Sequence, residues 1–209
     1  MLLSELFSGA PAIDIKTISD DSRKAMPDGI FFCIGGLKTD GHRFVNEAIG
    51  NGAKVIVYHD DIDTSGKAVY IKVDDVVKTF NLVIKQFYGN PTSNMTIYGI
   101  TGTNGKTTIA SIISDTLGEA CGYIGTLGIK YGDVMIDADL TTPPAISLHE
   151  NLARMHEADI GACAIEVSPI GIEQRRIDAI DFDVAIFTNL THDHPVSYTH
   201  LTLPTKSLV

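Results

Sequence analysis

The sequence predicts an α/β fold, with a small N-terminal α/β domain followed by a second domain built on a mostly parallel sheet. Short runs of β-branched and other apolar residues alternate along the chain with segments whose apolar residues recur at helical spacing. Clusters of Gly, Asn and Pro separate these segments, as is typical of turns. We expect domains at residues 1–90 and 91–194, followed by a tail at residues 195–209 that has no clear helical period.

Each element of the N-terminal domain has its own local signal. Apolar residues at helical spacing predict a helix over 44–49, which the Gly-Asn-Gly sequence at 50–52 ends. A longer amphipathic helix follows Asp74 or Asp75, either of which can cap it. Pro91 cannot continue that helix, so the domain boundary is placed there. The predicted strands are residues 29–34, 54–58 and 68–73.

The second domain repeats the alternation with a different first turn. A strand at 95–100 leads into a turn rich in Gly and Thr, and a helix begins near Lys106. Another helix is predicted over 146–155, and the apolar runs at 162–167 and 184–187 are typical of buried strands. The first helix has Ile109, Ile112, Ile113 and Leu117 on one face. In such folds, ligands bind at the carboxyl ends of the strands.

Composition limits the class of protein. The chain has 16 basic and 26 acidic residues and a net charge of -10, which argues against a general nucleic-acid or anionic-membrane binder. No apolar run approaches the ~20 residues needed to span a bilayer, and the first 15 residues lack the basic start of a secretory signal. Three separated cysteines support neither a disulfide framework nor a zinc site. We therefore expect a cytoplasmic protein.

The segment from Gly99 to Thr108 is typical of a loop that binds nucleotide phosphates. Glycines allow backbone N–H groups to point at phosphate oxygens, and the following helix adds partial positive charge. Lys106 would neutralise the β- and γ-phosphates of ATP, and the Thr107 hydroxyl would bind Mg²⁺. The generic P-loop pattern would require a glycine at Ile100. The alternative is a Gly-rich turn with a solvated lysine, which the flanking strand and helix disfavour.

Further polar residues follow the predicted strands. Glu166 comes at the carboxyl end of one of them, where a carboxylate is either a cap or a Mg²⁺ ligand. His192 and His194 suggest a transition-metal site only weakly, because no matching further ligands are evident, so one Mg²⁺-linked histidine is preferred. Arg175 and Arg176 form either a solvated face or a site for an anionic substrate, and spacing alone leaves both open.

Together these residues resemble the Mur ligases, specifically the UDP-N-acetylmuramoyl-tripeptide synthetases. The resemblance extends almost continuously from Ser19 to His194 and rests on several separated motifs. The N-terminal motifs distinguish this branch from folylpolyglutamate synthetases, which share only the ATP-domain pattern. The motifs are Asp21-Ser22-Arg23, Pro27 to Phe32, Gly36 with Asp40-Gly41-His42, Gly99 to Thr108, Thr141-Thr142-Pro143, Glu166-Val167-Ser168, Gln174 with Arg176, and Phe187 to His194.

The resemblance implies a role for each matching residue. It implies an N-terminal uridine-binding domain, in which Ser22, Leu37, Lys38 and Thr39 contact the UDP end of the substrate. It implies an ATP-binding domain whose sheet is truncated here. ATP would be held by Gly102, Thr103, Asn104, Gly105, Lys106, Thr107 and Thr108. The muramoyl-dipeptide would be held by Thr141, Thr142, Ser168, Gln174 and Arg176. Catalytic roles fall to Lys106, Glu166 and His194, and magnesium to Thr107, Glu166 and His194.

The implied reaction is ATP-driven amide formation in peptidoglycan precursor synthesis. The D-glutamyl carboxylate would be activated as an acyl phosphate, and meso-diaminopimelate or L-lysine would then displace phosphate. We expect small-molecule partners only, without nucleic acid or membrane, and a monomer. The alternatives are another Mur ligase step and a non-catalytic nucleotide-binding module.

The sequence departs from the family in two places. Pro169 follows Ser168 where many members have another Ser, which makes the local substrate contacts less certain. After His194 the family pattern stops, so residues 195–209 are expected to be non-native and the chain to be inactive by itself. Lys206 is not expected to replace the family's carbamylated lysine, because nothing around it matches.

Overall fold

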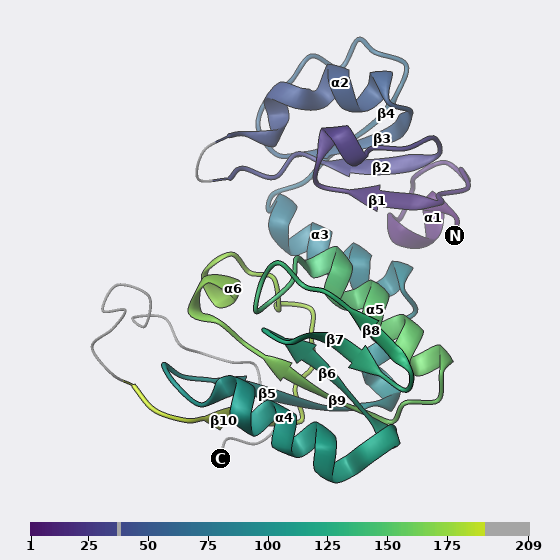
Figure 1. Cartoon of the computed structure of the whole chain (residues 1–209). Helices are drawn as coiled ribbons and strands as arrows, with labels where there is room; N and C mark the ends of the chain where they lie inside the picture. The colour runs from purple at the N-terminus through teal and green to yellow at the C-terminus, as the bar shows by residue number, and fades with distance from the viewer. Residues whose placement is uncertain (37–38, 191–209) are drawn as a thin grey trace. The chain divides into compact units, whose positions relative to one another are not determined.

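A computed structural model of the chain describes residues 1–36 and 39–190 and divides into two compact units, Met1–Phe87 and Tyr88–Val209 (Figure 1). The first unit carries a parallel sheet and the second a mostly parallel one, each with helices against it. The α/β class predicted from the sequence is confirmed.

The first unit is a four-stranded parallel sheet in the order β1-β2-β3-β4. The Asp75 side chain caps the long helix α3 by accepting from Lys78 N at 2.8 Å, which decides between the two predicted caps. The strands are β1 (Thr17–Ser19), β2 (Gly29–Phe32), β3 (Ala53–Tyr58) and β4 (Val69–Lys72), and the helices are α1 (Leu3–Leu6), η1 (Ser22–Lys24), η2 (Gly41–Phe44), α2 (Val45–Gly50) and α3 (Val76–Phe87).

Helices cover both faces of this sheet, so its central strands are apolar on both sides. Phe31 packs with Val45 and Ala48 of α2 on one face. Its neighbour Phe32 points to the other face, where its ring lies 5.0 Å from that of Phe80 on α3. All four residues of β2 are buried for this reason, and a strand buried on both faces appears as a continuous apolar run.

The second unit has six strands in the order β10-β5-β9-β6-β7-β8. The first four are parallel, while β7 and β8 add an antiparallel extension beside β6. The strands are β5 (Thr96–Thr101), β6 (Cys121–Gly125), β7 (Gly128–Tyr131), β8 (Val134–Ile136), β9 (Ala162–Glu166) and β10 (Val184–Phe187), and the helices are η3 (Pro91–Asn94), α4 (Lys106–Leu117), η4 (Gly118–Ala120), α5 (Ala145–Glu157) and α6 (Pro169–Glu173).

The two faces of this sheet form two separate apolar cores. Ala162 and Ala164 of β9 lie in the core that contains Ala110 of α4, and their small side chains let that helix approach the sheet. Cys163 and Ile165 alternate with them and lie in the core that contains α5 residues such as Leu148. This alternation directs the side chain at 166, the last residue of β9, toward the α4 face.

Some details differ from the sequence-based expectation. On α4, Ile112 and Leu117 are 57% and 43% exposed, because the buried stripe of that helix is centred on Ala110. His149 of α5, a polar residue that a helix would ordinarily expose, is fully buried, and its Nδ1 lies 3.0 Å from Ala145 O. Among the described residues, no helix has the length and apolar character to cross a membrane.

Candidate functional site

The loop between β5 and α4 exposes the first backbone amides of the helix. Gly102 and Gly105 have φ angles of 128° and 86°, a region that disfavours other residues, and no side chain of the described residues caps α4. A Cβ at Gly102 would lie 2.2 Å from Thr188 Oγ1, so only glycine fits. An uncapped helix N-terminus behind such a loop is suited to an anion.

Lys106 places its charge over this loop. Its Nζ donates to Gly102 O at 2.8 Å and to Thr103 O at 3.1 Å. Backbone carbonyls are weak partners for an ammonium group compared with phosphate oxygens. The side chain is therefore positioned at the loop and can exchange these carbonyls for a bound anion.

The residues after β10 hold the loop from the other side. Asn189 O accepts from Thr103 N at 2.9 Å, and the Asn189 side chain both accepts from Asn104 N and donates to Asn104 O, each at 3.0 Å. Thr188 Oγ1 donates to the same Asn104 carbonyl at 2.6 Å. The sequence identified Thr188 and Asn189 only as part of a motif, and gave no indication that they support the loop.

Glu166 is a fully buried carboxylate whose two oxygens have different partners. Oε1 accepts from the Tyr123 hydroxyl and, at 2.9 Å, from Thr126 N. Oε2 accepts from Thr107 Oγ1 at 2.9 Å and from Thr126 Oγ1 at 3.3 Å. Burial raises the pKa of Tyr123, so its hydroxyl remains a donor at neutral pH. These donors offset the cost of burying a carboxylate.

Thr107 and Glu166 together fit a magnesium ion. Neighbouring ligands of an octahedral Mg²⁺, at 2.0–2.1 Å from the metal, lie about 2.9 Å apart. Thr107 Oγ1 and Glu166 Oε2 are 2.9 Å apart, and both are oxygen donors of the kind Mg²⁺ prefers. The third predicted ligand, His194, lies outside the described residues, as do His192 and residues 195–209.

The predicted dipeptide-binding residues form one network attached to Glu166. Thr142 Oγ1 is 2.9 Å from the Glu166 carbonyl and 3.0 Å from Ser168 Oγ, and Thr126 links Thr141 to the carboxylate. Arg176 Nη1 donates to Thr142 O, and its Nε donates to Gln174 Oε1 at 3.0 Å. The structure thus brings together Thr107, Thr141, Thr142, Glu166, Ser168, Gln174 and Arg176.

The two neighbouring arginines have different environments. Arg175 has a φ of 55° and forms an ion pair with Asp178 at 2.7 Å. Arg176 turns toward Thr142, pairs with no carboxylate in the described part of the chain, and its pKa is lowered by burial. Of the two, only Arg176 is placed to meet an anionic group beside Thr142.

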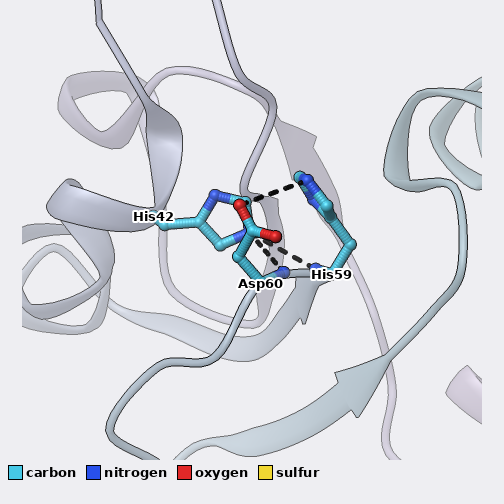
Figure 2. Close-up of side chains that lie close together, drawn as sticks. All are labelled: His42, His59 and Asp60. Atoms are coloured by element: carbon cyan, nitrogen blue, oxygen red, sulfur yellow. Dashed lines mark hydrogen bonds and ion pairs between the residues drawn. The ribbon is translucent and has the colours of Figure 1, made fainter.

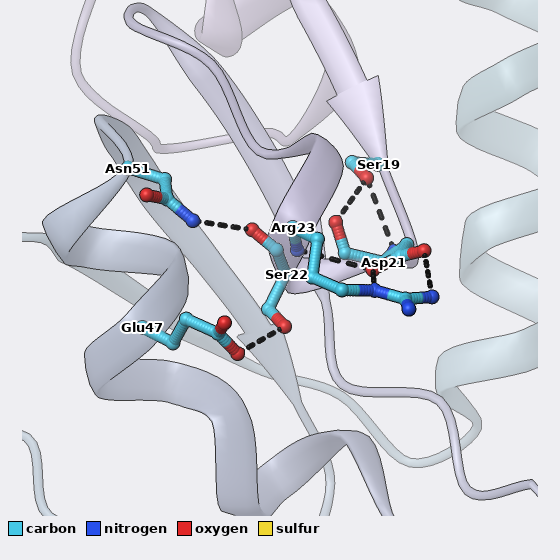
Figure 3. A network of polar contacts seen from close by, with 6 residues as sticks. All are labelled: Ser19, Asp21, Ser22, Arg23, Glu47 and Asn51. Atoms are coloured by element: carbon cyan, nitrogen blue, oxygen red, sulfur yellow. Dashed lines mark hydrogen bonds and ion pairs between the residues drawn. The ribbon is translucent and has the colours of Figure 1, made fainter.

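The residues predicted to bind the uridine end lie in the first unit. Figure 3 shows Ser22 between Glu47 and Asn51: its Oγ donates to Glu47 Oε2 at 2.6 Å, and its carbonyl accepts from Asn51 Nδ2 at 2.9 Å. Thr39 O accepts from Gly36 N at 2.8 Å. Leu37 and Lys38 lie outside the described residues.

His42, His59 and Asp60 form a cluster of three possible metal ligands (Figure 2). Asp40 Oδ1 lies 2.6 Å from His42 Nδ1, so Nε2 is the ring nitrogen with the free lone pair. That lone pair already accepts from the backbone N–H groups of His59 and Asp60, both at 3.3 Å. A cation would have to displace both donors, so we assign His42 a structural role joining η2 to the end of β3.

Two models of known protein families together match most of the chain. The model of the Mur ligase family, catalytic domain, matches residues 14–88, and that of the Mur ligase middle domain matches residues 100–200. The chain belongs to the Mur ligase family. The resemblance found in the sequence motifs is thereby confirmed.

Curated Mur ligase relatives extend well beyond this chain. A UDP-N-acetylmuramoyl-L-alanyl-D-glutamate–2,6-diaminopimelate ligase of Clostridium perfringens is 39% identical over 193 residues, which are 91% of this chain and 40% of the relative. The ligase of the same name from Listeria monocytogenes is 36% identical over 211 residues, covering 96% and 42% respectively. The chain therefore spans about two fifths of the length of these Mur ligases.

Solved structures of Mur ligases share the fold. The structure of a UDP-N-acetylmuramoyl-L-alanyl-D-glutamate–2,6-diaminopimelate ligase has a TM-score of 0.73 and 23% identity, covering 93% of this chain and 41% of that one. MurF ligase of Thermotoga maritima, solved in complex with ADP, has a TM-score of 0.54 and 21% identity, covering 83% and 37%. At these identities the likeness establishes the fold alone.

Two residues of this Mur ligase site were missed in the sequence. Tyr123 and Thr126 both contact the Glu166 carboxylate, yet neither matched a motif that we had singled out. The available signal was the run Gly122 to Thr126, an apolar stretch followed by a threonine, because ligands of open α/β sheets bind at the carboxyl ends of the strands.

Proposed function

We propose that this chain is part of a UDP-N-acetylmuramoyl-tripeptide synthetase, an ATP-dependent ligase that adds the third amino acid to UDP-MurNAc-L-Ala-D-Glu. The observation that carries the proposal is that one residue, Glu166, contacts both predicted sites. Glu166 contacts Thr107 of the phosphate loop through its side chain and Thr142 of the predicted peptide site through its carbonyl. The relatives are named for 2,6-diaminopimelate, which favours that amino acid over L-lysine.

The predicted roles of the residues follow from what each can reach. ATP with Mg²⁺ supplies the phosphoryl group that activates the D-glutamyl carboxylate, so that an incoming amine can displace phosphate. The loop amides and Lys106 bind and orient the phosphates, and Thr107 with Glu166 would hold the metal. Arg176 would orient the substrate carboxylate beside Thr142, and its planar group suits a carboxylate. Ser22, fixed by Glu47, would contact the uridine end.

The cellular setting follows from the same proposal. The substrates are small molecules, and a net charge of -10 suits an enzyme that binds neither nucleic acid nor a membrane surface. We place this ligase in the cytoplasm and expect it to be a monomer.

The test is calorimetric titration of the chain with UDP-MurNAc-L-Ala-D-Glu and, as the control ligand, UDP-MurNAc-L-Ala. We expect the dipeptide form to bind about tenfold more tightly or better, because Arg176 adds a charge-assisted hydrogen bond to the extra carboxylate. Arg176→Ala should remove this preference. Arg175→Asn is the matched control, since Asn tolerates the left-handed backbone at that position and should retain it.

Other results would contradict the proposal in distinct ways. Equal binding of both ligands would point to another Mur ligase step. Binding of ATP with no affinity for either uridine compound would favour a non-catalytic nucleotide-binding module.

A further inference from the structure

The two carboxylate oxygens of Glu166 have different hydrogen-bond partners, and Oε1 is the one held by a backbone donor. Oε1 receives the Tyr123 hydroxyl and the Thr126 N–H, and the second of these is a backbone donor fixed in place directly after β6. Oε2 receives only hydroxyl groups, from Thr107 at 2.9 Å and Thr126 at 3.3 Å. Hydroxyl groups rotate freely and can turn their hydrogens away. Oε2 is therefore the oxygen that can be given to a cation.

The direction of the Tyr123 hydrogen bond is fixed by its second neighbour. Leu127 N donates to the Tyr123 oxygen at 3.3 Å, so the tyrosine hydrogen is left for Glu166. The result is an ordered chain of donors from Leu127 through Tyr123 to Glu166 Oε1. Groups that orient a metal ligand in this way tune its affinity as strongly as many direct contacts.

The backbone between these residues is shaped around the carboxylate. A Cβ at Gly125 would lie 2.2 Å from Glu166 Oε1 and 2.5 Å from the Tyr123 hydroxyl oxygen. Only a glycine lets the turn approach this closely, and the approach brings Thr126 N to its 2.9 Å contact. The strand, the turn and the tyrosine all meet at the same oxygen.

We propose that Tyr123 and Thr126 are positioning residues that fix Glu166 Oε1 and thereby present Oε2, beside Thr107, to the metal of a bound metal–nucleotide complex. This inference rests on the proposed function, because it requires a nucleotide at the loop. It extends that function by assigning metal affinity to two residues outside the motifs. Without the Tyr123 hydroxyl, the carboxylate loses a donor and can rotate away from Thr107.

The experiment uses Mn²⁺ as a paramagnetic probe, since Mn²⁺ shares the oxygen preference of Mg²⁺. Free Mn²⁺ is measured by electron paramagnetic resonance in the presence of ATP and the 209-residue chain, and ATP binding is measured separately in EDTA. We expect Tyr123→Phe to weaken Mn²⁺ binding about 10- to 100-fold, while ATP affinity in EDTA changes little. The melting temperature should fall by a few degrees, because a buried carboxylate loses one of its donors, and the titrations are made well below it. Tyr131→Phe is the matched control, because Tyr131 is a buried tyrosine of the adjacent strand β7 whose hydroxyl has no partner among the described residues.

A second variant guards against a folding defect. Thr126 is exposed, so Thr126→Val should fold normally; it keeps the backbone donor and loses only the hydroxyl. This hydroxyl contacts Oε2, the oxygen that the metal takes, while the backbone donor to Oε1 remains, so Mn²⁺ affinity should fall far less in Thr126→Val than in Tyr123→Phe. An equal loss in the two variants would overturn the inference.

The outcomes separate this inference from the proposed function. Wild-type Mn²⁺ affinity in Tyr123→Phe would overturn the inference and leave the function intact. Equal loss of ATP binding with and without metal would also overturn it, because the role would then be structural. A wild-type chain that binds no ATP in either condition would overturn the proposed function itself.

Discussion

Gly99 is a residue at which the packing of the second unit can be tested directly. It lies on β5, and a Cβ there would come within 2.6 Å of the Phe182 ring, which is 1% exposed. A buried ring has no free space in which to move, so added atoms strain the core. Strand β5 must therefore keep glycine at this position.

We predict that Gly99→Ala lowers the free energy of unfolding by about 1–3 kcal/mol, the usual cost of overpacking. Chemical denaturation followed by circular dichroism measures this. Gly161→Ala is the control, since a Cβ there meets nothing within 4 Å, and it should be neutral or slightly stabilising. Equal effects of the two substitutions would show that Phe182 can move aside.

Cys33 makes the stability of the first unit depend on pH. Burial raises the pKa of this thiol to about 12, from an ordinary value of 9.0. Above pH 9 the unfolded chain loses this proton while the folded chain keeps it, so stability is complete below pH 9 and falls as the pH rises toward 12.

We predict that the free energy of unfolding falls by about 1.4 kcal/mol per pH unit above pH 9 through this residue. Urea denaturation in the presence of a reductant, at pH 8 and pH 10.5, compares the wild type with Cys33→Ala. The alanine variant should show a shallower decline. Parallel curves for the two proteins would mean that Cys33 ionises as easily in the folded state as in the unfolded one.

At the scale of elements, the loop between β5 and α4, our proposed nucleotide site, contacts the segment that follows β10. Asn189 makes a pair of side-chain hydrogen bonds to the backbone of Asn104, one accepted and one donated. These bonds fix the loop before any nucleotide arrives, which lowers the entropy cost of binding. Asn189, which follows β10, thus fixes the turn that follows β5, the neighbouring strand in the sheet.

We predict that Asn189→Ala raises the dissociation constant for ATP about 5- to 10-fold, which corresponds to the loss of about one net hydrogen bond. A fluorescent ATP analogue reports the affinity. Asn94→Ala, an exposed asparagine in η3, serves as the control and should bind as the wild type does. Unchanged affinity in Asn189→Ala would show that the loop holds its shape without this support.

Elements with strong local patterns were predicted well. The cap of α3 at Asp74 or Asp75, the amphipathic face of that helix and the apolar runs of β3 and β10 each depend on neighbouring residues, and the structure places the cap at Asp75. Strands β1, β6, β7 and β8 were not anticipated, because they gain their stability from pairing, β1 with β2, β6 with β9, and β7 with β6 and β8. A strand that is stabilised mainly by pairing with residues distant in sequence has only a weak local pattern from which it could be predicted.

At the scale of the whole molecule, the chain covers about two fifths of its relatives: 40% and 42% of the lengths of two of them. We predict that the 209-residue chain binds nucleotide but forms no tripeptide product by itself. Amide formation requires all three substrates to be oriented together. This chain spans only about two fifths of the length of the ligases named for that reaction, so we expect it to orient fewer than three. Liquid chromatography of reactions with ATP, UDP-MurNAc-L-Ala-D-Glu and diaminopimelate checks this, and any measurable tripeptide would contradict it.

The sequence alone determined the α/β class, the glycine-rich turn before the helix at Lys106 and the family, because these depend on local patterns and on residue types at fixed spacing. It also singled out Glu166 and, through the family motif, Arg176, although spacing alone left open whether the two arginines form a solvated face or a site for an anionic substrate. Only the tertiary structure decided that Arg176 faces Thr142, that Thr188 and Asn189 hold the loop, and that Tyr123 and Thr126 hold Glu166. The physical reason is that a buried carboxylate takes its donors from whichever strands end beside it, and strand order is set by packing between residues far apart in the chain.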